Sequence, residues 1–167
     1  MPTSYHQDRT FTGTELSADQ LANAEFEACT FRQCAWGGVL PSNTRFTDCA
    51  FEQCDLNTAL TKNTAFRTVR FEGCKLLGLQ LDQCSAFLFA MGFDQCRLGF
   101  AVFRSAVLKK TSLNGCRLHE VDFSGADLWE RRWRTATCWM PCSTTPTWRR
   151  RTCARPTTSV STPSRTG

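Results

Sequence analysis

The sequence predicts an all-β solenoid, a chain that coils repeatedly around a narrow hydrophobic interior. The first indication is a Phe, Leu or Trp at almost every fifth position from Phe11 to Leu81 and, after a slip of two residues, from Leu88 to Leu128. The second is a small residue two positions before most of these centres. A period of five is neither the 3.6 of a helix nor the 2 of a flat strand. The chain must therefore turn a corner every five residues, with the centre and the small residue facing inward.

This register defines the expected interior. Pro41 and Thr61 interrupt the first run of centres. Coils stacked through backbone hydrogen bonds at roughly the 4.8 Å strand spacing would join all other centres into one core. The predicted inward centres are Phe26, Phe31, Phe46, Phe51, Leu56, Phe66, Phe71, Leu76, Leu81, Phe93, Leu98, Phe103, Leu108, Leu113, Leu118, Phe123 and Leu128. The predicted small inward residues are Ala24, Cys29, Cys34, Cys49, Cys54, Cys74, Cys96, Ala101, Ala106, Cys116 and Ala126.

Several units share a more specific pattern. Cys-Asp-Leu at 54–56, Ala-Glu-Phe at 24–26 and Ala-Asp-Leu at 126–128 follow A(D/N)LXX. In this pattern the chain resembles the pentapeptide-repeat family. The resemblance implies a right-handed quadrilateral β-helix with four units in each coil. Residues 9–128 hold 24 units, so about six coils are expected.

Charge and composition divide the chain into three expected segments: a flexible N-terminal cap at 1–8, the repeat at 9–128 and an irregular basic tail at 129–167. Residues 1–128 carry 12 Lys/Arg and 14 Asp/Glu, whereas the tail carries 8 Arg and a single acid. The net charge of +5 therefore belongs to the tail. No apolar run approaches the roughly 18 residues of a membrane-spanning helix. Because the first ten residues lack a secretory signal, a cytoplasmic location is expected.

The tail keeps the five-residue register in an unusual form. Counting on from Leu128 gives Trp133, Cys138, Ser143, Trp148 and Cys153, four of which are Trp or Cys. Trp and Cys codons both begin with TG, so a reading frame shifted by one base would encode Leu, Met or Val there. Two interpretations stay open. Either a frameshift near residue 129, or after Trp133, hides further repeats, or the basic tail is genuine and disordered because none of its centres is Leu or Phe.

The cysteines show no spacing typical of a metal site or a disulfide framework. Eight of the eleven lie before residue 129, all at the small inward position if Cys84 is included by extending the first register. A thiol at such a position packs as a compact apolar group. Pairs such as Cys29 and Cys34 lack the close, convergent spacing of zinc ligands. No metal site and no cofactor are expected.

Catalytic residues are not expected either. His119 and Glu120 are neighbours on an outward corner but have no third member, and His6 falls in the expected cap, so both histidines should be solvated. The segment 37–44 interrupts the repeat, and it is either a binding loop or a tolerated imperfection.

The expected function is a non-enzymatic protein-interaction scaffold of unknown partner, without contacts to membrane or nucleic acid. The resemblance implies an alternative, a DNA mimic that binds the type II topoisomerases DNA gyrase or topoisomerase IV and confers fluoroquinolone protection. Family members that bind gyrase pair through C-terminal segments, so a dimer is expected only if the C-terminal frame is restored. The candidate acidic binding surface consists of Asp48, Glu52, Asp55, Glu72, Asp82, Asp94 and Asp127.

Overall fold

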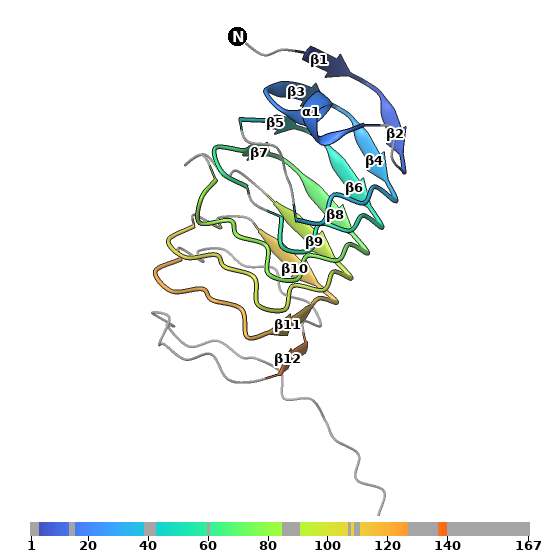
Figure 1. Ribbon diagram of the computed structural model, residues 1–167. Coiled ribbons are helices and arrows are strands. Elements are labelled where there is room, and N and C mark those ends of the chain that lie inside the picture. Colours follow the sequence, from blue (N-terminus) through green and yellow to red (C-terminus); the bar gives the residue numbers. More distant parts are fainter. Residues whose placement is uncertain are drawn as a thin grey trace, which may run out of the picture.

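The chain forms a four-sided coil in which each turn stacks on the one before (Figure 1). The computed structural model describes residues 4–13, 16–38, 43–59, 61–84, 91–106, 108, 111–126 and 137–139. A short helix, α1 (Ala18–Leu21), lies between the second and third strands. The strands are β1 (Ser4–Gln7), β2 (Thr10–Thr12), β3 (Ala24–Glu27), β4 (Thr30–Arg32), β5 (Arg45–Thr47), β6 (Ala50–Glu52), β7 (Ala65–Arg67), β8 (Arg70–Glu72), β9 (Gly92–Asp94), β10 (Ser112–Asn114), β11 (Arg117–His119) and β12 (Thr137–Trp139).

Two sides of the coil are parallel sheets, and the other two are joined by isolated bridges. One sheet has the order β1-β3-β5-β7 and the other β10-β9-β8-β6-β4-β2. Paired residues lie 20 apart in the sequence, as Phe26 with Phe46. Bridges such as Asp55 to Lys75 and Val102 to Asp122 hold the remaining sides. The chain thus returns to the same side after four units, and the six strands of the larger sheet span about five turns.

The sixth expected coil depends on residues from 127 onward, which lie outside the described residues apart from 137–139. The slip in register falls where the sequence predicts it. Arg70 on β8 pairs with Gly92 on β9, an offset of 22 residues, and the offset returns to 20 between β9 and β10. The stack of strands therefore continues past the two extra residues.

Most corners are formed by the residue two positions after a centre, which adopts a left-handed backbone. Gln33 has φ 52°, Gln53 has φ 54° and Gly73 has φ 62°. L-residues pay about 1–2 kcal/mol for this conformation, and Asn, Asp and Gly tolerate it best. One left-handed residue per unit is what turns the chain at each corner.

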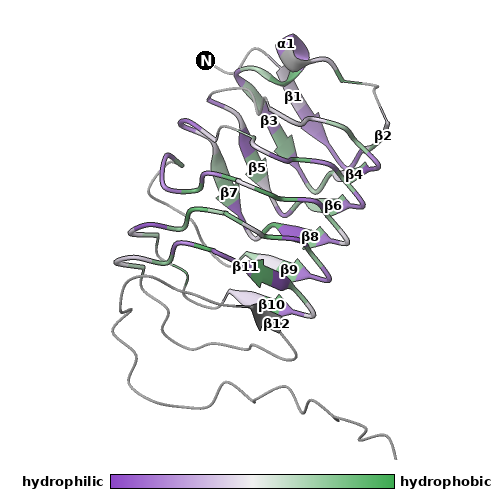
Figure 2. Ribbon diagram, turned by 60° about the horizontal axis from the view of Figure 1, so that its bottom comes forward, coloured by the Kyte–Doolittle hydropathy of each residue, from purple (hydrophilic) through white to green (hydrophobic). Residues whose placement is uncertain are grey.

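The interior is a column of stacked side chains. The described inward centres are no more than 6% exposed, and the small inward residues are buried except Ala126, which is partly buried. Leu128 lies outside the described residues. The rings of Phe11, Phe31, Phe51, Phe71 and Phe93 stack with centroids 4.8 to 5.4 Å apart. In Figure 2 hydrophobic segments recur from coil to coil beside hydrophilic ones.

The first coil departs from the expected pattern in two places. Ser17 and Gln20 form a capping box, in which the Ser17 amide donates to Gln20 Oε1 at 2.9 Å. This motif favours the helical turn α1 over a fifth-residue corner, yet Leu21 still reaches the core. In addition, β1 pairs with β3 at the 20-residue offset, so Ser4 is already part of the coil although it lies in the segment expected to be a cap.

The interruptions of the register have a local explanation. Thr61 occupies a centre and is fully buried, and its hydroxyl donates to the Gln80 carbonyl. Thr44, at the end of the interrupting segment, donates to the Leu21 carbonyl at 2.7 Å. Pro41 and the rest of 39–42 lie outside the described residues.

Part of the basic tail is a strand. β12 pairs with β11 in parallel, and Cys138 lies opposite Leu118 at the same 20-residue offset. This differs from the expectation of an irregular tail. Backbone hydrogen bonds carry the pairing and do not depend on the side chain at the centre. Among the described residues, no helix is long and apolar enough to cross a membrane.

Candidate interaction surface

The thiols line the interior and are chemically quiet. Cys34, Cys54, Cys74, Cys96 and Cys116 stand one turn apart and form a ladder in which neighbouring thiols hydrogen-bond. Each Sγ also lies within hydrogen-bond reach of a backbone carbonyl, as Cys74 Sγ does at 3.3 Å from the Phe51 carbonyl oxygen. Within the described residues all cysteines are free, and no group of three or more His, Cys, Asp or Glu is arranged to hold a metal ion.

Burial makes the thiols of Cys49 and Cys84 poor nucleophiles. It raises the pKa of the Cys49 thiol to about 12, and that of Cys84 also to about 12. In the ladder, hydrogen bonds from Cys54 and Cys96, together with burial, raise the pKa of Cys74. At Cys49 and Cys84 the nucleophilic thiolate is therefore scarce at neutral pH.

The two histidines have different surroundings. His119 Nε2 lies 3.3 Å from Glu120 Oε1, and both side chains are about half exposed. His6, by contrast, stacks on Phe26 with ring centroids 5.0 Å apart, and burial lowers its pKa. His6 was expected to be solvated. It stands instead at a centre position, which the register would have revealed if counted back one unit from Phe11.

The larger sheet presents its outer side to solvent, and we call this side the strand face. Glu52, Glu72 and Asp94 lie side by side on β6, β8 and β9 and form the acidic column. Arg32 continues this column on β4, with its Nε 2.8 Å from Glu52 Oε2. Glu72 and Asp94 have no ion pair within the part of the chain that the structure describes.

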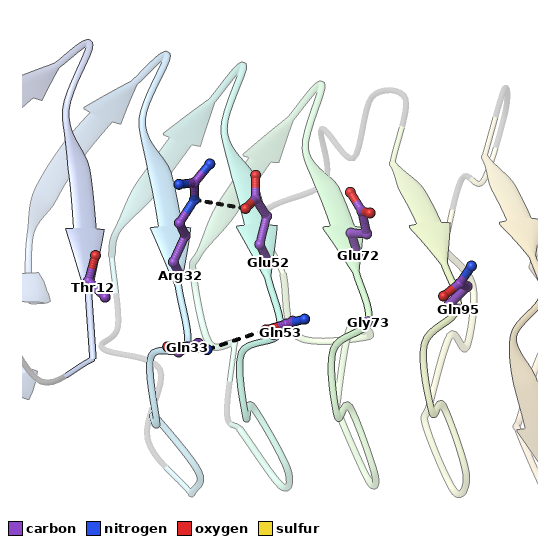
Figure 3. Close-up of a pocket in the computed structure, with 8 residues that line it drawn as sticks. All are labelled: Thr12, Arg32, Gln33, Glu52, Gln53, Glu72, Gly73 and Gln95. Atoms are coloured by element: carbon purple, nitrogen blue, oxygen red, sulfur yellow. Dashed lines mark hydrogen bonds and ion pairs between the residues drawn. The ribbon is translucent and has the colours of Figure 1, made fainter.

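A shallow groove of about 350 Å³ runs along the corner beside the acidic column (Figure 3). Gln33 Nε2 lies 3.4 Å from Gln53 Oε1, and the line of glutamines is broken by Gly73 before it resumes at Gln95. This break hollows the surface between coils. The groove is lined by Thr12, Arg32, Gln33, Glu52, Gln53, Glu72, Gly73 and Gln95.

The other predicted acids do not join this column. Asp55 lies on the next side of the coil, where its Oδ2 is 3.6 Å from Lys75 Nζ. Asp48 stands at a left-handed corner, and Asp82 is exposed on a third side. Asp127 lies outside the described residues. The structure thus brings together three of the seven predicted acidic residues.

The side that carries Asp55 holds basic and apolar groups, and we call it the bridge face. Successive bridges place Lys75, Arg97 and Arg117 in one line, the basic column. On the same face Leu77 is 40% exposed, and Phe100 at the adjoining corner is 53% exposed. Phe100 also has φ 58°, a left-handed conformation that is rare for a bulky side chain.

Comparison with known proteins identifies the repeat. The family model described as pentapeptide repeat region matches residues 44–123. The chain contains a pentapeptide-repeat region. No curated protein matches the sequence at a significant level.

A solved pentapeptide-repeat structure shares the coil. HetL, a pentapeptide-repeat protein involved in heterocyst differentiation regulation from the cyanobacterium Nostoc sp. strain PCC 7120, aligns with 21% identity and a TM-score of 0.60. The alignment covers 70% of this chain and 54% of HetL, so the chain spans about half the length of that protein. QnrB1, a plasmid-mediated fluoroquinolone resistance protein, aligns with 20% identity over 80% of this chain and 67% of QnrB1, with a TM-score of 0.49.

Sequence reasoning missed the bridge face of the pentapeptide-repeat region. The acids were selected by residue type, without sorting them by side of the coil. The signal was present. Reading every twentieth residue, with two residues added after position 84, places Lys75, Arg97 and Arg117 in one line.

Proposed function

We propose that the chain is a non-enzymatic protein-binding rod whose strand face holds a basic surface of a partner protein. The observation that carries this proposal is the acidic column. Glu52, Glu72 and Asp94 are neighbours on adjacent strands, and only the first has a cation beside it among the described residues.

Like charges opposite one another on a sheet destabilise it. Neighbouring strands are about 4.8 Å apart, so Glu72 and Asp94 repel each other in the free chain. A row of lysines or arginines on a partner removes that repulsion when it binds. The groove beside the column adds glutamine amides that can hydrogen-bond to the same partner.

The proposal is tested with fluorescein-labelled nona-arginine as a basic probe and fluorescence anisotropy as the measurement. The whole chain carries a net charge of +5 and repels this cationic probe as a whole, so binding reports a local acidic surface. We expect binding that weakens about tenfold in Glu72→Gln/Asp94→Asn, since two exposed charges are lost. The control Asp82→Asn, on another side of the coil, should bind as the wild type does. Equal binding by all three chains would contradict the proposal.

A second candidate partner is a type II topoisomerase, whose DNA-binding groove is basic. A regularly spaced acidic column on a narrow rod supports this candidate, because it offers negative charge at repeating intervals as a nucleic acid does. The test is DNA supercoiling by gyrase with and without a fluoroquinolone. Protection that is lost in Glu72→Gln/Asp94→Asn would support it. If a saturating concentration of the chain leaves supercoiling unchanged, with and without the fluoroquinolone, gyrase is excluded as the partner and the more general proposal stays in place.

A further inference from the structure

The strand face and the bridge face carry complementary patterns of charge in the same order along the rod. On the strand face the column reads Arg32, Glu52, Glu72 and Asp94, one residue per coil. On the bridge face the column reads Asp55, Lys75, Arg97 and Arg117, again one per coil. A positive charge followed by three negative charges thus meets a negative charge followed by three positive ones. We propose that the rods associate side by side, with the strand face of one copy against the bridge face of a second copy.

The coil geometry fixes how the two copies must lie. When two coils with the same axis direction touch, their facing strands run in opposite directions. A residue after the centre on one copy then faces a residue before the centre on the other. In the sequence, Glu52, Glu72 and Asp94 each come one residue after a centre. Lys75, Arg97 and Arg117 each come one residue before a centre. Only rods pointing the same way therefore bring the two columns together.

The register is also fixed, at a shift of one coil. With this shift Arg32 faces Asp55, and Glu52 faces Lys75 of the second copy. The two ion pairs already present within each chain, Arg32 with Glu52 and Asp55 with Lys75, then form one alternating cluster of four charges. Without the shift, Glu52 would face Asp55, which is repulsive.

The same shift pairs the charges that have no ion pair within the described chain. Glu72 then faces Arg97, and Asp94 faces Arg117. All four side chains are exposed in the single chain. Since the spacing of both columns is set by the same stacking of coils, every pair can form at once without distortion of either rod.

Each face also has a second line of residues, on the other side of its centres. The side chains in these two lines have complementary sizes. At the one-coil shift Ala50 faces Leu77, and Gly92 faces His119, a small residue against a large one each time. These positions give the exposed Leu77 an apolar neighbour.

In the coil between these two contacts, the large residue is on the strand face and the small one on the bridge face, because Arg70 faces Gly99. Phe100 adjoins Gly99 at the corner, so the guanidinium of Arg70 comes within reach of its ring and can form a cation–π contact. This contact gives a role to an exposed aromatic residue that stands in an unfavourable backbone conformation.

The contact joins two different faces, so it is heterologous. The two faces adjoin at a corner, and successive copies are therefore turned by about a quarter turn. Because of the one-coil shift the fourth copy does not close onto the first. One strand face and one bridge face stay free at the ends of any assembly, so the average mass should rise continuously with concentration.

The test is sedimentation velocity of the full chain over a range of concentrations, at about 50 mM NaCl and again at about 500 mM, where exposed charges are screened. We expect association at low salt that is lost at high salt. Arg97→Glu/Arg117→Glu and Glu72→Arg/Asp94→Arg should each remain monomeric, whereas an equal mixture of the two variants should associate, because the mixture restores opposite charges. Arg67→Glu on β7 and Asp82→Arg serve as matched controls outside both faces and should associate as the wild type does.

Folding of each variant is checked by far-UV circular dichroism. The neutral pair Glu72→Gln/Asp94→Asn keeps the side-chain size, and Arg97→Gln/Arg117→Gln removes the positive charges without introducing negative ones. Each pair should weaken association at least tenfold. Three results would overturn the inference. The first is a wild-type chain that is monomeric at low salt, and the second is a pair of folded variants that fail to associate when mixed. The third is association that persists in both charge-reversed variants, which would indicate contact through the ends of the coils. None of these readouts involves another protein, so they are independent of the proposed partner.

Discussion

The inward small residues decide how closely the coils wind, because they let the backbone approach the aromatic centres. Cysteine suits this position, since its side chain is compact and its thiol can donate to a carbonyl of the preceding coil, as Cys49 does to the Phe26 carbonyl at 3.4 Å. Val69 occupies the equivalent position one turn after Cys49 and is fully buried. The position therefore selects for size and not for thiol chemistry.

Burial of Cys49 makes the stability of the rod depend on pH. Its thiol has a pKa of about 12 in the folded chain, against an ordinary value of 9.0 after unfolding. The raised folded pKa means that stability is complete below about pH 9 and falls as the pH rises toward 12, because only the unfolded chain ionises there. Guanidinium unfolding at about pH 8 and pH 10 measures this loss.

Cys49→Val provides the control, since Val69 shows that valine fits the same column. We expect this variant to lose less stability between the two pH values than the wild type does. An equal loss would mean that the Cys49 thiol does not contribute to the pH dependence.

Among the elements, the corner turns are as important as the strands. Each strand is only three or four residues long, and the left-handed residue after it directs the chain to the next side. At the corner that follows the bridge face, Gly38, Thr58 and Gly78 occupy the successive turns before Phe100. Phe100 is the bulkiest of these corner residues and the least suited to a left-handed backbone.

Phe100→Gly should therefore stabilise the isolated chain. We expect the free energy of unfolding to rise by about 1 kcal/mol, because glycine adopts a positive φ without steric cost. The measurement is chemical denaturation at about 500 mM NaCl, where association through exposed charges is screened. Leu77→Ala, at an exposed position without positive φ, should not stabilise the chain. A Phe100→Gly chain less stable than the wild type would show that the contact of Phe100 with His119 outweighs the strain.

The sequence predicted the coil and its interior because one period governs both. Each unit repeats the same choice of apolar centre and small partner, so a single count places Phe26, Phe71 and Phe103 inside. Departures from the period were harder to predict. The helix α1 arises from a local capping box, and β12 pairs through its backbone although its centre, Cys138, is neither Phe nor Leu.

The surface could be predicted only in part, since charge is not periodic. Residue type identified Glu52, Glu72 and Asp94 but also acids on other sides of the coil. Which acids are neighbours depends on the 20-residue offset and on the slip of two residues between β8 and β9. The groove depends on the missing side chain at Gly73, a local detail that a scan for charged residues passes over.

For the whole molecule, the pairing of β11 with β12 bears on the reading frame of the tail. Leu118 lies opposite Cys138, a position where the shifted frame encodes Leu, Met or Val. A chain that continues in the shifted frame after residue 128 should add stacked coils with apolar centres. Because the stability of a repeat rod grows with each added interface, we expect its midpoint of thermal unfolding to lie at least about 5 °C above that of the present chain.

The comparison is made by differential scanning calorimetry, with a chain ending at Ala126 as the control. That control should unfold near the temperature of the present chain, since the tail contains no Leu, Ile or Phe to extend the core. A restored chain no more stable than the control would favour a genuine basic tail. Sequencing the gene across codons 120–170 then shows whether a base is missing.

The hydrogen bonds between coils run along the axis of the rod, whereas the chain itself winds across it. A pulling force applied at the two ends would therefore load these bonds one rung at a time instead of shearing many together. Each turn that peels away would release about 20 residues, or roughly 70 Å of extended chain. The rod should resist bending and crushing through its packed aromatic column, yet lengthen in regular steps under tension at low force.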